Sequence, residues 1–339
     1  MSSNSVTFPI GTESDLTPLF AYQPTGVPLW DGIGHTINQT LLRDLFYGAW
    51  AQVWLKKSKP TPKPTDQYQV TITSPNADHD VTAYATQIPA FIAAVSTGIG
   101  IYNTNKSKLP STGVSFLPPF GLSMLNTSSI QLLHYPPSET LSYMDYLYSP
   151  TNRRWENLLG YNAYPGAQNS LAETIVDVIP IAAAGGTDGS KALIPVQDAF
   201  VPYVQAMLNV YLRRSPGGTG TQPIVAYGGP VMSFLEGNFK QSNLKPLSLI
   251  PLQLLTGGPA TPVLCANHPS EFFYYKPSQE KEFTEILVQD LTAAGWQTKM
   301  SQNPDADPKQ TLQDVSTYWD QNPNLVDQIF ADQVAEFES

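Results

Sequence analysis

The side chains best suited to chemistry follow a short apolar segment, TPVLCA (261–266), whose composition predicts a buried strand. His268, Pro269 and Ser270 come just after it, and ligands bind at the carboxyl ends of strands in parallel sheets. An imidazole there can donate a hydrogen bond to a carbonyl oxygen that gains negative charge, and the fixed φ of Pro269 restrains the turn. Ser270 can bind a phosphate or cap the next turn. The alternative is a histidine that only completes a strand-to-loop corner.

Other signatures of catalysis or metal binding are missing from the sequence. The loop GGTDGSK (185–191) lacks the spacing of a phosphate-binding P-loop, and neither His-Glu-x-x-His nor Gly-x-Ser-x-Gly occurs. The four histidines are scattered, and the single cysteine, Cys265, excludes an internal disulfide and a cysteine-rich zinc site. We therefore expect no metal and no cofactor.

Strands and helices are expected to alternate around His268. Helices are expected at 196–214 and 279–300, and strands at 172–181, 223–229 and 261–266. This alternation is typical of a parallel sheet covered by helices on both faces. The predicted fold class is therefore α/β, a three-layer α/β/α sandwich with a short parallel sheet. Gly228 and His268 would then lie at the carboxyl edge of that sheet.

The chain is expected to have three regions. Residues 1–66 form a Pro-rich arm with one amphipathic helix at 41–55, residues 67–300 form the α/β domain, and residues 301–339 form an acidic helical segment. The N-terminal part of the second region includes a predicted strand at 67–74 and a loop-like stretch at 104–138.

Composition and charge narrow the classes of function. The 339 residues carry a net charge of −10, and residues 271–339 hold 13 acidic and 4 basic side chains, so −9 of that charge lies there. This weighs against tight nonspecific binding to a polyanion. No run of about 18 apolar residues predicts a membrane span, and no secretory signal is visible, so we expect a cytoplasmic or nuclear protein. Low charge with abundant Pro, Tyr, Asn and Thr also suits a self-assembling, coat-like structural protein.

Two segments resemble the uracil-DNA glycosylase superfamily. IVAYGGPVMSFL (224–235) is similar to the family's strand that ends in Leu-Gly before a helix, and VLCANHPSEFFYY (263–275) is similar to its strand that ends in His-Pro-Ser. GVSFLPPFGLSM (113–124) faintly resembles the first motif of the single-strand-selective branch. The resemblance covers about residues 110–300. It implies a three-layer fold that flips a base out of DNA and cleaves its N-glycosidic bond.

The resemblance also implies roles for individual residues. His268 would stabilise negative charge on the departing base, Phe120 would stack on the base, and Ser270 would contact a backbone phosphate. Phe272 or Phe273 would replace the apolar wedge, and Asn267 completes the expected binding residues. The basic side chains expected to contact phosphates are Lys56, Lys57, Lys59, Arg153, Arg154, Arg213 and Arg214. The implied partner is DNA or a nucleobase-containing small molecule.

The sequence departs from the family at two positions that carry chemistry. The water-activating residue aligns near Phe116 or Leu117, and the base-reading asparagine aligns near Ile179-Pro180. None of these side chains activates water or reads a base. Asn126 or Asp145 could take the place of the missing water-activating residue. A second hypothesis is therefore a non-catalytic descendant of the fold that binds a small ligand or a protein partner.

Overall fold

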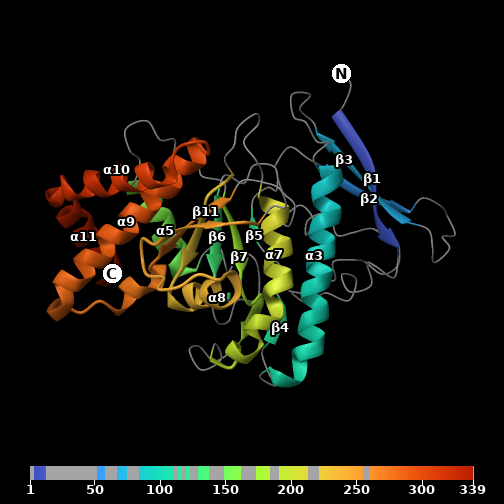
Figure 1. Cartoon of the computed structure of the whole chain (residues 1–339), viewed down its shortest axis with the longest axis horizontal. Helices are drawn as coiled ribbons and strands as arrows, with labels where there is room; N and C mark the ends of the chain where they lie inside the picture. Colours follow the sequence, from blue (N-terminus) through green and yellow to red (C-terminus); the bar gives the residue numbers. More distant parts are fainter. Residues whose placement is uncertain are drawn as a thin grey trace. The chain divides into compact units, whose positions relative to one another are not determined.

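The structure is a computed structural model of the chain (Figure 1). The residues that it describes are 4–12, 52–57, 67–74, 84–109, 114–116, 120–121, 129–136, 149–161, 173–183, 191–212, 221–254 and 260–338. They belong to two compact units. The first unit comprises Met1–Thr127, Tyr135–Tyr143 and Ala172–Tyr211, and the second comprises Ser128–His134, Met144–Leu171 and Leu212–Ser339.

A mainly parallel sheet forms the centre of the second unit. The strands of this sheet that lie in the second unit are β6 (Ser129–Leu133), β9 (Ile224–Tyr227), β10 (Leu249–Leu252) and β11 (Thr261–Ala266). β9 pairs in parallel with both β6 and β11, and β10 pairs antiparallel with β11. Every side chain of β6, β9 and β11 is buried, as expected for parallel strands that are covered on both faces. The predicted α/β fold class is therefore confirmed.

Among its described residues, the second unit has five helices. They are α5 (Pro150–Tyr161), α8 (Gly229–Phe239), α9 (Glu280–Gln302), α10 (Pro308–Asp320) and α11 (Pro323–Glu338). Local sequence sets where they begin: the hydroxyl of Ser149 accepts a hydrogen bond from Asn152 N at 3.3 Å, and Asp307 accepts one from Gln310 N at 2.8 Å. Proline follows both capping residues, at a position where a helix tolerates its missing N–H.

The long helix α9 holds this unit together. It packs against β9, β11, α5, α10 and α11. The side chain of Gln297 joins it to two strands, since Nε2 donates to the hydroxyl of Ser129 at 2.8 Å and Oε1 accepts from the hydroxyl of Tyr227 at 3.3 Å. These hydrogen bonds satisfy polar groups that would otherwise be costly to bury.

The described residues of the first unit include an antiparallel sheet and two helices that pack together. The strands β1 (Asn4–Thr12), β3 (Gln67–Ser74) and β2 (Gln52–Lys57) lie in that order. Helix α3 (Tyr84–Asn105) packs against α7 (Val201–Tyr211), which follows the 3-10 helix η2 (Ile194–Phe200). Gly98 permits this close approach, because a β-carbon there would stand 2.6 Å from Tyr203 and 2.7 Å from Phe116.

Two short strand pairs complete the described part of the first unit. β5 (Phe120–Gly121) pairs antiparallel with β7 (Glu173–Asp177), and β4 (Val114–Phe116) pairs antiparallel with β8 (Ile181–Ala183). The short 3-10 helix η1 (Lys106–Lys108) ends α3.

The structure differs from the expected organisation in two places. Residues 52–55, expected at the end of an amphipathic helix, lie in β2, where Trp54 pairs with Thr71 of β3. Pairing with a neighbouring strand outweighs a helical spacing when the residues are as β-prone as Val53 and Trp54. The expected boundary at residue 67 also divides one sheet, since β1 and β2 come from the arm and β3 from beyond it. The rest of the expected helix, 41–51, lies outside the described residues.

The acidic C-terminal segment is helical, as expected, and consists of α10 and α11. Among the helices that the structure describes, none combines the length and the apolar character needed to cross a membrane.

Candidate functional site

Two histidines and a glycine mark the carboxyl edge of the parallel strands in the second unit. His134 follows β6, Gly228 follows β9, and His268 comes two residues after β11. Strand register brings them to one edge, since Leu132 lies opposite Ala226 and Tyr227 lies opposite Ala266. Because the carboxyl edge of such a sheet is where ligands bind, this is the candidate site.

The backbone of Gly228 makes close contact with His268. Its N–H donates to the carbonyl oxygen of Ala266 at 2.9 Å, and its φ of 83° lies in a region that favours glycine. A β-carbon on Gly228 would stand 3.1 Å from the β-carbon of His268. The glycine thus lets the strand-to-helix turn of β9 pack against the histidine.

The imidazole of His268 is held by the residue that begins the next turn. The backbone N–H of Ser270 donates to Nδ1 at 3.2 Å, so Nδ1 carries a lone pair there. The hydroxyl of Ser270 lies 2.6 Å from the same nitrogen and acts as a second donor to it. A neutral ring with Nδ1 as acceptor carries its proton on Nε2.

Burial and neighbouring positive charge keep this imidazole neutral. Desolvation, followed by the charges of His134 and Arg154, lowers the pKa of His268 to about 4. At neutral pH the ring is therefore an uncharged donor through Nε2. This is the state in which histidine can bind a carbonyl oxygen without releasing a proton.

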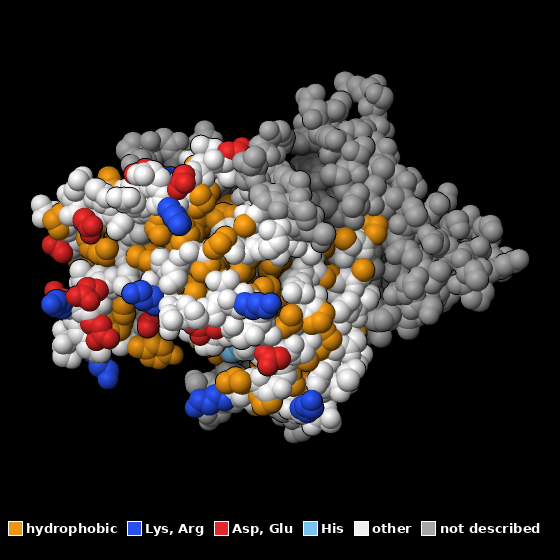
Figure 2. Space-filling model, viewed as in Figure 1, with side chains coloured by type: hydrophobic (Ala, Val, Ile, Leu, Met, Phe, Trp, Pro, Cys, Tyr) orange, Lys and Arg blue, Asp and Glu red, His pale blue; other side chains and the backbone are white. Residues whose placement is uncertain are grey.

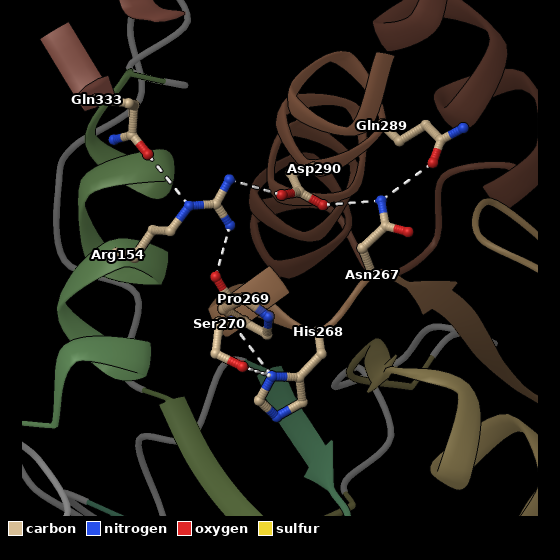
Figure 3. A network of polar contacts seen from close by, with 8 residues as sticks. All are labelled: Arg154, Asn267, His268, Pro269, Ser270, Gln289, Asp290 and Gln333. Atoms are coloured by element: carbon tan, nitrogen blue, oxygen red, sulfur yellow. Dashed lines mark hydrogen bonds and ion pairs between the residues drawn. The ribbon is translucent and has the colours of Figure 1, made fainter. Parts of the chain in front are cut away.

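A buried ion pair positions the turn that carries His268 (Figure 3). Arg154 of α5 donates from Nη1 to the carbonyl oxygen of Pro269 at 2.9 Å and from Nη2 to Oδ2 of Asp290 at 2.8 Å. Its Nε donates to Oε1 of Gln333 in α11 at 3.1 Å. The guanidinium thus ties three helices to the His-Pro-Ser turn.

Asn267 belongs to the same network. Its side-chain amide donates to Oδ1 of Asp290 at 3.1 Å and to Oε1 of Gln289 at 3.0 Å (Figure 3). Burial raises the pKa of Asp290, while the ion pair with Arg154 and the hydrogen bonds from Arg154 and Asn267 act in the opposite direction. Both carboxylate oxygens are engaged, so Asp290 supports the turn.

Four residues expected to touch nucleic acid make contacts within the chain. Phe272 is 1% exposed and packs against Tyr275, Phe283 and Phe330, so the apolar wedge would fall to the half-buried Phe273. Arg154 is buried in its ion pair and is not positioned for a phosphate, and Arg153 beside it is exposed. The hydroxyl of Ser270 and the amide of Asn267 hold His268 and the turn.

The other expected site residues lie in the first unit or outside the described residues. Phe120 lies in β5, and its stacking role stays a prediction. Phe116 is buried in a cluster with Tyr102 and Tyr203, and Ile179 is also fully buried. Lys56 and Lys57 lie in β2. The expected residues that lie outside the described part are Lys59, Leu117, Asn126, Asp145, Arg213 and Arg214.

The sequence analysis missed His134. The strand before it, Ser129–Leu133, lies inside a stretch that was expected to be a loop because Pro-rich segments flank it. The signal was weak, since only three of the five residues of SIQLL are apolar, although a polar side chain follows the segment. In the second unit, the structure puts this segment beside β9 at the candidate site.

Comparisons with known proteins give no further assignment: no protein-family model matches the sequence, and no curated protein matches it. Within the described ranges, no cluster of three or more histidine, cysteine or acidic side chains is suited to hold a metal ion.

Proposed function

We propose that the carboxyl edge around His268 binds a nucleobase and that the protein is a divergent relative of the uracil-DNA glycosylases, cleaving an N-glycosidic bond. The observation that carries this proposal is the state of His268: its Nδ1 accepts from Ser270 and its pKa is lowered to about 4. It is thus a neutral donor through Nε2.

The chemistry of glycosidic cleavage makes use of such a donor. As the bond between the sugar and the base breaks, its electron pair stays with the base, and negative charge develops on a carbonyl oxygen of the ring. A hydrogen bond from Nε2 to that oxygen becomes stronger as the charge grows and so stabilises the transition state. Water then supplies the hydroxyl group to the sugar carbon, and its proton neutralises the base. The turn is held rigid by Arg154 through Pro269, which keeps the donor in place.

Release of free base from oligonucleotides tests the proposal. Single- and double-stranded probes containing uracil, hypoxanthine, xanthine or a mismatched thymine are incubated with excess protein, and free base is measured by chromatography. We expect release by the wild-type chain and a loss of about 10²-fold in the His268→Ala variant. His268→Gln, which retains an N–H donor, should retain part of the rate. Absence of release by folded wild-type protein from every probe would contradict cleavage.

A second function, binding without cleavage, is favoured by the state of Asp290. Both its oxygens are already bonded to Arg154 and Asn267, so it does not serve to activate water. Calorimetric titration with free uracil and other bases separates the two functions. Binding that His268→Ala abolishes, in the absence of any base release, would support a ligand-binding descendant of the fold.

A further inference from the structure

A groove with aromatic and acidic side chains lies beyond the His-Pro-Ser turn in the second unit. It has a volume of about 600 Å³ and is bounded by the 3-10 helices η3 (Pro269–Tyr274) and η4 (Pro277–Gln279) and the first turns of α9. Its lining includes Glu271, Phe273, Tyr274, Tyr275, Glu282 and Ile286. Ligand sites commonly have volumes of roughly 300–1,000 Å³, so the groove is large enough to hold a long side chain with its neighbours.

Two tyrosines line the groove, and one is packed among other rings whereas the other is exposed. The ring of Tyr275 stacks on Phe272, with centroids 6.1 Å apart and an angle of 12°, and it meets Phe283 and Phe330 edge-on at 5.4 Å each. Tyr274 next to it is 71% exposed. Tyrosine is among the residue types that dominate binding energy at protein interfaces.

The carboxylates that line the groove favour a positively charged ligand. Burial raises the pKa of Glu271, and the negative charges of Asp290 and Glu282 raise it further, against the opposing effect of Arg154. Glu282 contributes the smallest of these effects, and a cation close to Glu271 would offset the negative charges that face it. Lys276 is the basic residue of the lining. Over the surface that α9, α10 and α11 form, Figure 2 shows acidic, basic and apolar side chains interspersed.

We propose that the groove lined by Glu271, Tyr274 and Glu282 binds an arginine side chain from a basic segment of a partner protein. A guanidinium is planar and stacks on tyrosine, while its N–H groups donate to carboxylates. Oε2 of Glu282 accepts a hydrogen bond from Nε2 of Gln279 at 3.2 Å, and its carboxylate retains lone pairs for a further donor. A bare metal ion suits the groove less well. The groove has only two carboxylates among its lining residues, and most of the other lining residues are aromatic or apolar. The proposal does not depend on the function of His268.

Fluorescence anisotropy with the full chain tests this proposal. The probe is a labelled peptide of about ten residues with two arginines among glycine and serine, and matched peptides carry citrulline or lysine in their place. We expect saturable binding of the arginine peptide and affinity about tenfold lower for citrulline, which has nearly the same shape but no charge. Tyr274→Ala should weaken binding about tenfold, and its exposed position leaves folding intact.

A pair of matched double variants distinguishes a specific site from general attraction to an acidic surface. Glu271→Gln with Glu282→Gln removes the two charges of the lining, whereas Glu280→Gln with Glu285→Gln removes two charges of α9 outside the lining. The first should weaken binding about tenfold and the second less than about twofold. Equal effects of the two double variants, equal binding of citrulline and arginine peptides, or no saturation up to about 1 mM peptide would overturn the proposal.

Discussion

The β-carbon of His268 lies 3.1 Å from the place that a β-carbon on Gly228 would occupy. This distance shows how the candidate site is built: two neighbouring parallel strands end at the same level, and the turn after one packs on the histidine after the other. A side chain at 228 would have to displace the imidazole or the backbone that carries it. The glycine is therefore part of what positions His268.

We expect Gly228→Ala to destabilise the protein by about 1–3 kcal/mol, because its φ of 83° is strained for alanine and the added methyl group crowds His268. Gly237→Ala is the matched control, since a β-carbon there meets nothing within 4 Å and the residue lies in α8. It should stabilise by up to about 1 kcal/mol. Urea denaturation measures both changes. Equal free energies of unfolding for the two variants would show that position 228 is not constrained.

Breaking the buried ion pair should be costly. Arg154→Met leaves the carboxylate of Asp290 buried without its cation and frees the carbonyl of Pro269, so we expect a loss of about 3–5 kcal/mol in the free energy of unfolding. Arg153→Met, at the exposed neighbouring position, should change it by less than about 0.5 kcal/mol.

The double variant Arg154→Met, Asp290→Leu removes both charges and should recover part of the stability lost in the single variant. A single variant as stable as the wild type would show that the network contributes nothing to holding the turn.

Two aromatic residues of η3, Phe272 and Tyr274, should behave differently. Phe272→Ala removes a ring that is 1% exposed and packed among three others, so it should cost about 3–5 kcal/mol. Tyr274→Ala removes a ring that is 71% exposed and should cost less than about 0.5 kcal/mol. Thermal and urea denaturation measure the two costs. A tolerated Phe272→Ala would return this residue to the candidates for a surface wedge.

One buried strand and one long helix were predicted closely from the sequence. The strand at 261–266 is the one observed, and the helix expected at 279–300 spans Glu280–Gln302. The spacing of apolar residues that identifies such elements can be recognised within a short stretch of sequence. β6 escaped prediction because its parallel partner, β9, lies about ninety residues away in the chain, and nothing near β6 marks that pairing.

The candidate site was predictable only in part. His268 was found because its position after a buried strand is a local feature. Arg154 was expected to be a surface cation, yet it pairs with Asp290, 136 residues further along the chain. Phe272 was expected at the surface, yet it packs on Phe330. Which side chain is buried against which depends on how distant segments pack together, and single-sequence patterns do not carry that information.

The protonation state of His268 is the central claim, and long-range ¹H–¹⁵N NMR of the imidazole between about pH 4 and pH 8 measures it directly. Because burial, His134 and Arg154 lower the pKa from an ordinary value of 6.5 to about 4, we predict a neutral ring with its proton on Nε2 throughout most of this range. Ser270→Ala, which removes one donor to Nδ1, should raise the pKa. An imidazole that titrates near 6.5, or that carries its proton on Nδ1 when neutral, would contradict the account.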